Sequence, residues 1–213
     1  MDKQQVQKAL TELKNNSPKR KFTQSYDLVI NLKNVVTKQN PVDIFVTLPH
    51  SQGKKVLITC FCDQQLAEDA QKNCDVVIKE TEFPKYADKK LLKKLAITSD
   101  YCIAQANFMP KVAQIFGKVL GVRGKMPNPK LGCVVPPNAN LTPLVKKLRS
   151  TVHLQTKKGT NLQCLVGKQD QSDEQVIDNI LAVYQAVIKT LPNEQQNIKN
   201  VTVKFTMSKP VKI

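Results

Sequence analysis

Cations and backbone-bending residues concentrate in one segment, LGVRGKMPNPKLG (120–132). It combines three glycines and two prolines with Arg123, Lys125 and Lys130, and it contains no Asp or Glu. Because glycine and proline interrupt helices and strands, the segment is expected to form a loop. A basic loop of this kind can hold nucleotide phosphates in an enzyme, contact a nucleic acid, or form a solvated turn.

Nucleotide-binding chemistry is not supported by the spacing. A P-loop needs glycine five positions before its Gly-Lys pair and Ser or Thr after it, but this chain has Val119 and Met126 there. The glycines also lack the GxGxxG spacing of a dinucleotide-binding loop. The two histidines, His50 in a turn and His153 in a strand, are expected to be structural. We therefore predict no enzyme, no cofactor and no metal site; the remaining enzyme alternative is a nucleotide site elsewhere in an α/β region.

Charge is distributed unevenly along the 213 residues. The formal net charge is +16, from 33 basic and 17 acidic side chains. Residues 13–26, 101–169 and 195–213 contain no acid and carry 19 of the basic residues. Such exclusion favours a polyanionic partner, because carboxylates beside phosphates are repulsive. No apolar run reaches membrane-spanning length, so we expect a cytoplasmic protein whose partner is a nucleic acid; an acidic protein partner is the alternative.

The kind of nucleic acid follows from the side chains available. There are 30 lysines, which attract phosphates, but only three arginines, and aromatic residues make up 5% of the chain. A base-stacking platform for single strands is therefore not predicted. Phe22, between Lys21 and Thr23, is the aromatic side chain expected to touch a base or ribose, unless it begins a strand in the core. The composition favours backbone and shape recognition of a structured RNA.

Two styles of secondary structure divide the chain. Both ends show half-exposed strands, at 26–32 and 42–48 (read as two antiparallel strands) and at 151–156, 162–167 and 200–206, with helices at 2–14 and 173–191. The middle alternates buried strands (56–61, 74–79, 101–106) with helices (63–73, 87–96, 110–119), and a further helix is expected at 142–149.

This alternation predicts the fold class. We expect an α+β domain I built from both termini (1–52 and 149–213) and an inserted α/β domain II (53–148) with a parallel, Rossmann-like sheet. The six cysteines are expected to be buried free thiols, with Cys60 and Cys62 on opposite faces of a strand.

Several segments resemble ribosomal protein L-one of the large subunit, in its archaeal form. They are RKFTQSYDLVINL, VTLPH, LGVRGKMPNPKLG, PPNANLTPLVKKLRSTV, VGKQDQSDEQVIDNI and VKFTMSKPVKI, in family order over essentially the whole chain. The resemblance implies the same two-domain fold and binding of large-subunit ribosomal RNA at the mobile side stalk near exit-site tRNA. It also implies possible repression of the protein's own operon mRNA, and a monomer when free.

The resemblance also implies an RNA site in domain I. Its residues would be Arg20, Lys21, Phe22, Ser25, Asp27, Lys157, Lys168, Thr206, Met207, Ser208 and Lys209, with Arg123, Lys125 and Lys130 as a possible second loop facing RNA or tRNA. Two residues depart from the family pattern: Ser208 replaces a glycine, which is expected to reshape the contact, and Val122 replaces a proline, which is expected to make the loop less rigid.

Overall fold

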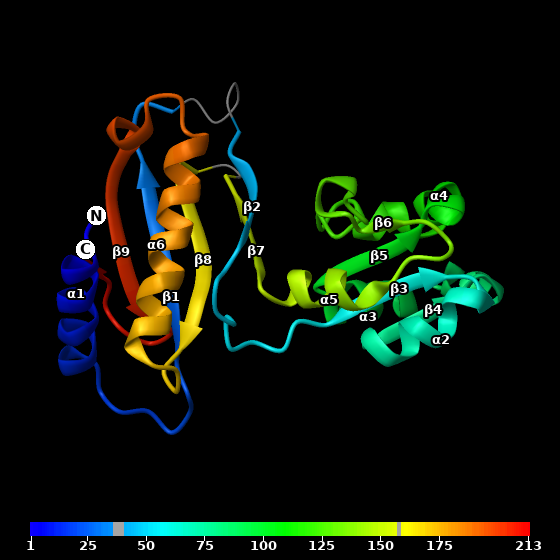
Figure 1. Ribbon diagram of the computed structural model, residues 1–213, viewed down its shortest axis with the longest axis horizontal. Helices are drawn as coiled ribbons and strands as arrows, with labels where there is room; N and C mark the ends of the chain where they lie inside the picture. Colours follow the sequence, from blue (N-terminus) through cyan, green and yellow to red (C-terminus); the bar gives the residue numbers. More distant parts are fainter. Residues whose placement is uncertain (36–40, 157–158) are drawn as a thin grey trace. The chain divides into compact units, whose positions relative to one another are not determined.

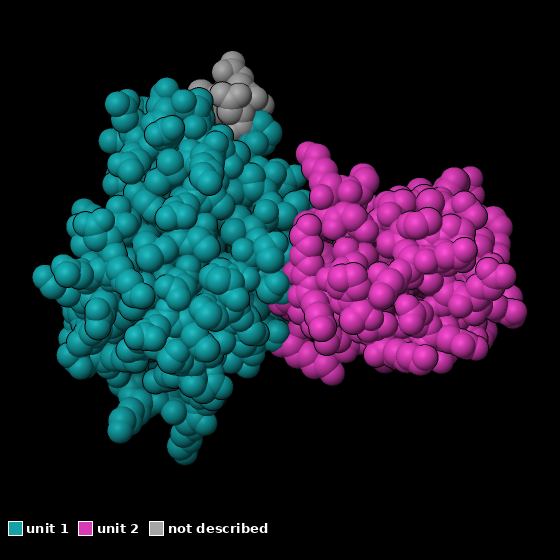
Figure 2. Space-filling model, viewed as in Figure 1, with its two compact units in different colours: residues 1–54, 150–213 teal, residues 55–149 magenta. Residues whose placement is uncertain are grey.

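The computed structural model describes residues 1–35, 41–156 and 159–213, which form two compact units. Unit 1 contains Met1–Lys54 and Ser150–Ile213, and unit 2 contains Lys55–Arg149 (Figures 1 and 2). Unit 1 has antiparallel sheets and unit 2 a parallel one. The predicted fold class, two domains of α+β and α/β type, is therefore confirmed.

Unit 1 is built around a four-stranded antiparallel sheet in the order β10-β9-β1-β8. Its long helix α6 crosses one face of the sheet in Figure 1, and α1 contacts both α6 and the strand β9. A separate two-stranded sheet joins β2 to β7. The elements are α1 (Lys3–Asn16), β1 (Ser25–Leu32), β2 (Asp43–Thr47), β7 (Thr151–Gln155), β8 (Asn161–Lys168), α6 (Asp173–Thr190), the short helix η4 (Glu194–Asn197), β9 (Ile198–Phe205) and β10 (Val211–Lys212).

Alternation along β1 explains why one sheet face is covered. Tyr26, Leu28, Ile30 and Leu32 are buried, whereas the residues between them are half-exposed. Because successive strand residues point to opposite faces, the buried set packs with the apolar stripes of α1 and α6. The other face of the sheet stays partly accessible, as the sequence predicts for a strand with one wet face.

The expectation that 26–32 and 42–48 form two strands of one antiparallel set was wrong. β1 pairs with β8 and β9, whereas β2 pairs with β7. The reason is topological: β2 leads into the inserted unit and β7 returns from it, so the two crossings of the chain pair with each other. The two-residue strand β10 was also missed, because such a short strand has no periodicity to detect.

Unit 2 is a parallel sheet in the order β4-β3-β5-β6 with helices between its strands. All five residues of β3 are buried, as the unbroken apolar run at 56–61 predicts. The elements are β3 (Ile58–Cys62), α2 (Gln64–Asn73), β4 (Val76–Lys79), η1 (Glu80–Ala87), α3 (Lys89–Thr98), β5 (Tyr101–Gln105), η2 (Ala106–Phe108), α4 (Met109–Leu120), η3 (Pro129–Leu131), β6 (Val134–Val135) and α5 (Leu141–Arg149).

The cysteines are free thiols, four of them buried and two partly buried. The placement of Cys60 and Cys62 on opposite strand faces was wrong, because residues two apart on a strand share a face. The Cys60 thiol lies within hydrogen-bonding reach of both Cys62 and Cys74. These hydrogen bonds, followed by burial, raise the pKa of Cys60, so it is expected to stay protonated.

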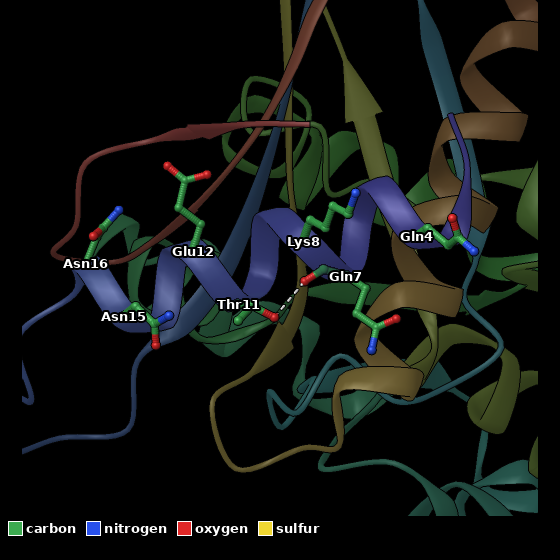
Figure 3. A pocket seen from close by; sticks show the side chains of 7 residues that line it. All are labelled: Gln4, Gln7, Lys8, Thr11, Glu12, Asn15 and Asn16. Atoms are coloured by element: carbon green, nitrogen blue, oxygen red, sulfur yellow. Dashed lines mark hydrogen bonds between the residues drawn. The ribbon is translucent and has the colours of Figure 1, made fainter.

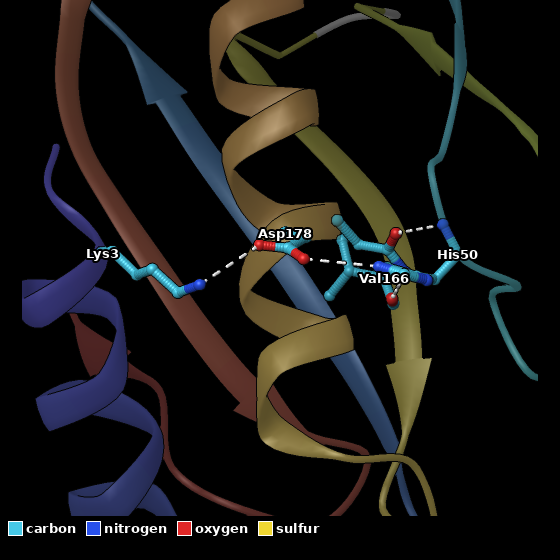
Figure 4. A network of polar contacts seen from close by, with 5 residues as sticks. Lys3, His50, Val166 and Asp178 are labelled. Atoms are coloured by element: carbon cyan, nitrogen blue, oxygen red, sulfur yellow. Dashed lines mark hydrogen bonds and ion pairs between the residues drawn. The ribbon is translucent and has the colours of Figure 1, made fainter.

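Both histidines have structural contacts. His50 Nε2 lies 3.3 Å from Asp178 Oδ2, and Lys3 Nζ lies 3.7 Å from the other carboxylate oxygen (Figure 4). His153 Nε2 lies 2.5 Å from Asp43 Oδ1. Each imidazole therefore lies beside a carboxylate of unit 1.

Candidate nucleic-acid interface

One end of the four-stranded sheet gathers most of the predicted site residues. Ser25, the first residue of β1, pairs with Lys168, the last residue of β8, and Tyr26 pairs with Phe205, the last residue of β9. The turn after Phe205 therefore lies beside the segment that enters β1. We call this region the sheet-end site and define it as residues 20–27, 168–169 and 206–209.

Hydrogen bonds hold the two chain ends together at this site. Ser25 N donates to Thr206 Oγ1 at 3.1 Å, and Met207 N donates to Gln24 Oε1 at 3.2 Å. Gln169 N donates to the Gln24 carbonyl at 2.9 Å. Gln24 is 2% exposed and links all three segments, yet a lone glutamine beside a polar turn gave no signal in the sequence.

Ser208 closes the turn after β9. Its hydroxyl accepts from Phe205 N at 2.8 Å and donates to the Lys209 carbonyl at 3.0 Å. Ser208 is not among the described non-glycine residues with positive φ, so its backbone conformation does not require glycine. The Ser208 side chain thus makes two hydrogen bonds within the turn that a glycine could not make.

Two large apolar side chains are exposed at the sheet-end site. Phe22 is 50% exposed and Met207 is 56% exposed. Phe22 is absent from the buried core of unit 1, so the alternative that it begins a strand in the core is not supported. An exposed ring among cations can stack on a base or ribose.

Cations surround these apolar groups. Arg20, Lys21 and Lys209 are exposed in the segments that flank Phe22 and Met207. Lys168 is half-buried, and a Cβ added at Gly53 would lie 2.9 Å from Lys168 Cγ, so its aliphatic stem packs on the turn before unit 2. Lys157, also predicted for the site, lies outside the described residues.

Asp27 is the acid of the predicted site, and it is half-buried in β1 opposite Lys204. Burial raises the pKa of Asp27, an effect that Lys204 partly offsets. Burial thus makes the charged form of this carboxyl group less favourable than it would be in water.

The Asp27→Asn variant is expected to melt at a higher temperature than the wild type at pH 7. Because the pKa of Asp27 is higher in the folded than in the unfolded state, its protonated form favours folding at pH values below the unfolded-state pKa. That stability is lost as the pH rises through the folded-state pKa. The difference between variant and wild type should therefore shrink towards pH 3. Circular dichroism melts from pH 3 to 7 measure this, with Asp170→Asn, at an exposed position, as the control; a variant that melts lower at pH 7 contradicts the burial argument.

The three cations of the basic loop of unit 2, Arg123, Lys125 and Lys130, differ in their contacts. Lys125 Nζ donates to the Ala96 carbonyl at 3.0 Å and to the Ser99 carbonyl at 2.5 Å, which satisfies the C-terminal end of α3. Arg123 and Lys130 are exposed instead. Lys125 thus has the structural role that the sequence left open, and the other two cations face solvent.

Val122 and Gly124 define the tip of this loop. Val122 is 89% exposed, and Gly124 has φ +67°, a conformation that favours glycine. The loop lies within unit 2, away in sequence from the sheet-end site.

Other classes of site find no support in the described parts of the chain. Within those ranges, no group of three or more His, Cys, Asp or Glu side chains could hold a metal ion. No helix there is both long and apolar enough to span a bilayer.

These observations describe a two-unit protein with an acid-poor, cationic sheet end assembled from both termini. The model of the family described as Ribosomal protein L1p/L10e matches residues 13–209. The chain therefore belongs to that family of ribosomal proteins.

Archaeal relatives match over almost the full length. The chain is 38% identical to large ribosomal subunit protein uL1 of Nanoarchaeum equitans, covering 92% of this chain and 93% of that protein. It is 38% identical to uL1 of Methanothermococcus thermolithotrophicus (100% and 99%) and 38% identical to uL1 of Pyrococcus abyssi (100% and 96%). The resemblance to the archaeal form is confirmed, and the chain is a protein of the large ribosomal subunit.

Proposed function

We propose that the chain binds large-subunit ribosomal RNA through the sheet-end site of unit 1, in the cytoplasm and as part of the ribosome, without catalysing a reaction. The observation that carries the proposal is the convergence of residues from the two chain ends. Ser25 is tied to Thr206 there, and Gln24 to Met207, each pair by a direct hydrogen bond, and Phe22 lies two residues before Gln24. Exposed apolar groups, short hydroxyls and flanking cations therefore lie in neighbouring segments at one end of the sheet, a combination that suits binding to a grooved polyanion.

The RNA proposed is the mobile side stalk near the exit site for tRNA. In this arrangement unit 1 (domain I) holds the RNA, and Arg123 and Lys130 of unit 2 (domain II) are available to the phosphates of stalk RNA or of the exiting tRNA. The free protein would be a monomer. Because the site reads shape and a few contacts, an mRNA hairpin that imitates the stalk would compete for it, which would allow the chain to repress its own operon.

The test is binding of the purified chain to a transcript of its organism's own stalk RNA, compared with a scrambled hairpin of equal length. We expect the stalk transcript to bind at least tenfold more tightly, the effect of one or two specific contacts. Crosslink mapping after co-sedimentation with large subunits should recover peptides containing Phe22 and Met207. Equal affinity for both RNAs would remove the proposal of specific stalk recognition.

A further inference from the structure

A groove of about 730 Å³ adjoins the sheet-end site on unit 1. One wall is the end of α1 and the residues after it (12–18), and the other is the turn and short strand at 207–212. Met207, Ser208 and Lys209 belong both to this groove and to the sheet-end site. A ligand that covers the site therefore reaches the groove without leaving the surface.

The wall formed by residues 12–18 contains a polar atom without a hydrogen-bond partner among the described residues. The Ser17 hydroxyl is buried and has no hydrogen-bond partner among the described residues. Such groups are rare and need a physical reason. Ser17 as a whole is half-exposed and lines the groove, so a rotation about its χ1 bond is the movement that would bring the hydroxyl to the groove, where it could donate and accept.

The other groups that line the groove supply positive charge, apolar surface and one carboxylate. Lys209 and Lys212 supply positive charge, and Pro18, Pro210 and Met207 supply apolar surface. Glu12 is the acid of the lining; it lies on α1, on the side that the C-terminal segment follows (Figure 3). A carboxylate accepts hydrogen bonds from the amino group of a nucleobase, and lysines attract phosphate.

We propose that this groove receives one unpaired nucleotide, turned out of the RNA helix that the sheet-end site binds. Its base would lie against the proline and methionine surfaces, within reach of Glu12 and Ser17, and its phosphate would lie near Lys209 and Lys212. The volume of about 730 Å³ falls within the range of small-ligand sites. Proteins read RNA sequence mostly through such splayed bases. This inference depends on the proposed function, because the nucleotide belongs to the same RNA.

The test compares Ser17→Ala and Lys212→Met with Lys189→Met, which removes the same charge at the C-terminal end of α6. Each groove variant should weaken binding of the chain's own stalk transcript by about three- to tenfold, the range of one lost contact. Lys189→Met should bind like the wild type. Ser17→Ala should not melt at a lower temperature, because the hydroxyl it removes had no partner. A transcript containing 4-thiouridine should crosslink to peptides from 12–18 or 207–212.

The outcomes separate this inference from the proposed function. If Phe22→Ala weakens binding while both groove variants bind like the wild type, the groove does not hold a nucleotide, and the sheet-end site remains. If the wild-type chain does not bind the transcript at all, both proposals fail. If the groove variants lose a protein partner but keep their RNA affinity, the groove is a protein contact and the inference is wrong.

Discussion

Phe116→Ala is expected to lower the free energy of unfolding of unit 2 by about 3–5 kcal/mol, the usual loss for a buried phenylalanine. Phe116 lies on α4 and is 0% exposed. Its ring centroid lies 4.7 Å from that of Phe61, and 5.6 Å from those of Phe83 and Tyr86. Alanine removes the ring that these three contact, so the loss includes both buried area and a cavity.

Urea unfolding followed by circular dichroism measures this change. Ile97→Ala, at a position 64% exposed on α3 of the same unit, is the matched control and should change the unfolding free energy by less than about 0.5 kcal/mol. Phe116→Leu should fall between the two variants. A loss below about 1 kcal/mol for Phe116→Ala would mean that the aromatic cluster repacks around the gap.

The same variant also tests which unit holds the RNA. The sheet-end site lies entirely within unit 1, whereas Phe116 belongs to the core of unit 2. At temperatures below the melting of unit 2, Phe116→Ala should therefore bind the stalk transcript as the wild type does. A parallel loss of RNA affinity would show that unit 2 contributes contacts or order to the site.

The alternation of strand types made the two-unit fold predictable from the sequence. The unbroken run at 56–61 requires a strand covered on both faces, and the alternation in YDLVINL requires a strand covered on one. These local patterns specify which faces are buried. They do not specify which strands pair, because the residue pattern of β2 is compatible with pairing to either β1 or β7. The choice between these two strands depends on where the chain enters and leaves unit 2.

The site was predictable only where residue type carried information. Phe22 was singled out because it is an aromatic residue between a lysine and a threonine at a strand entrance, and the structure places it at the surface. Gln24 could not be found, because its role depends on hydrogen bonds to segments far away in sequence. The role of Lys125 was equally hidden, since the α3 carbonyls that it caps lie 26 and 29 residues earlier.

The second large effect is expected at the sheet-end site itself, where Phe22→Ala and Thr206→Val should each weaken stalk-RNA binding by about 1–3 kcal/mol. Phe22→Ala removes an exposed ring available for stacking. Thr206→Val keeps the shape of the side chain but removes the hydroxyl that accepts from Ser25 N at 3.1 Å. That change loosens the tie between the two chain ends and removes a group that can reach a 2′-hydroxyl.

Filter binding over a range of salt concentrations separates this specific loss from electrostatic attraction. Log affinity should fall linearly with log salt, by about 0.7–0.9 for each phosphate neutralised. Phe22→Ala should lower affinity for the stalk transcript at every salt concentration with an unchanged slope, because it removes no charge.

Lys21→Met should instead make the slope shallower by about one phosphate, on the stalk and on a scrambled hairpin alike. Leu91→Ala, an exposed apolar truncation on unit 2, should change neither quantity. Equal losses for Phe22→Ala on both RNAs would show that the ring supports the fold of the site rather than reading the RNA, since stacking on a particular unpaired base is lost only where that base is present.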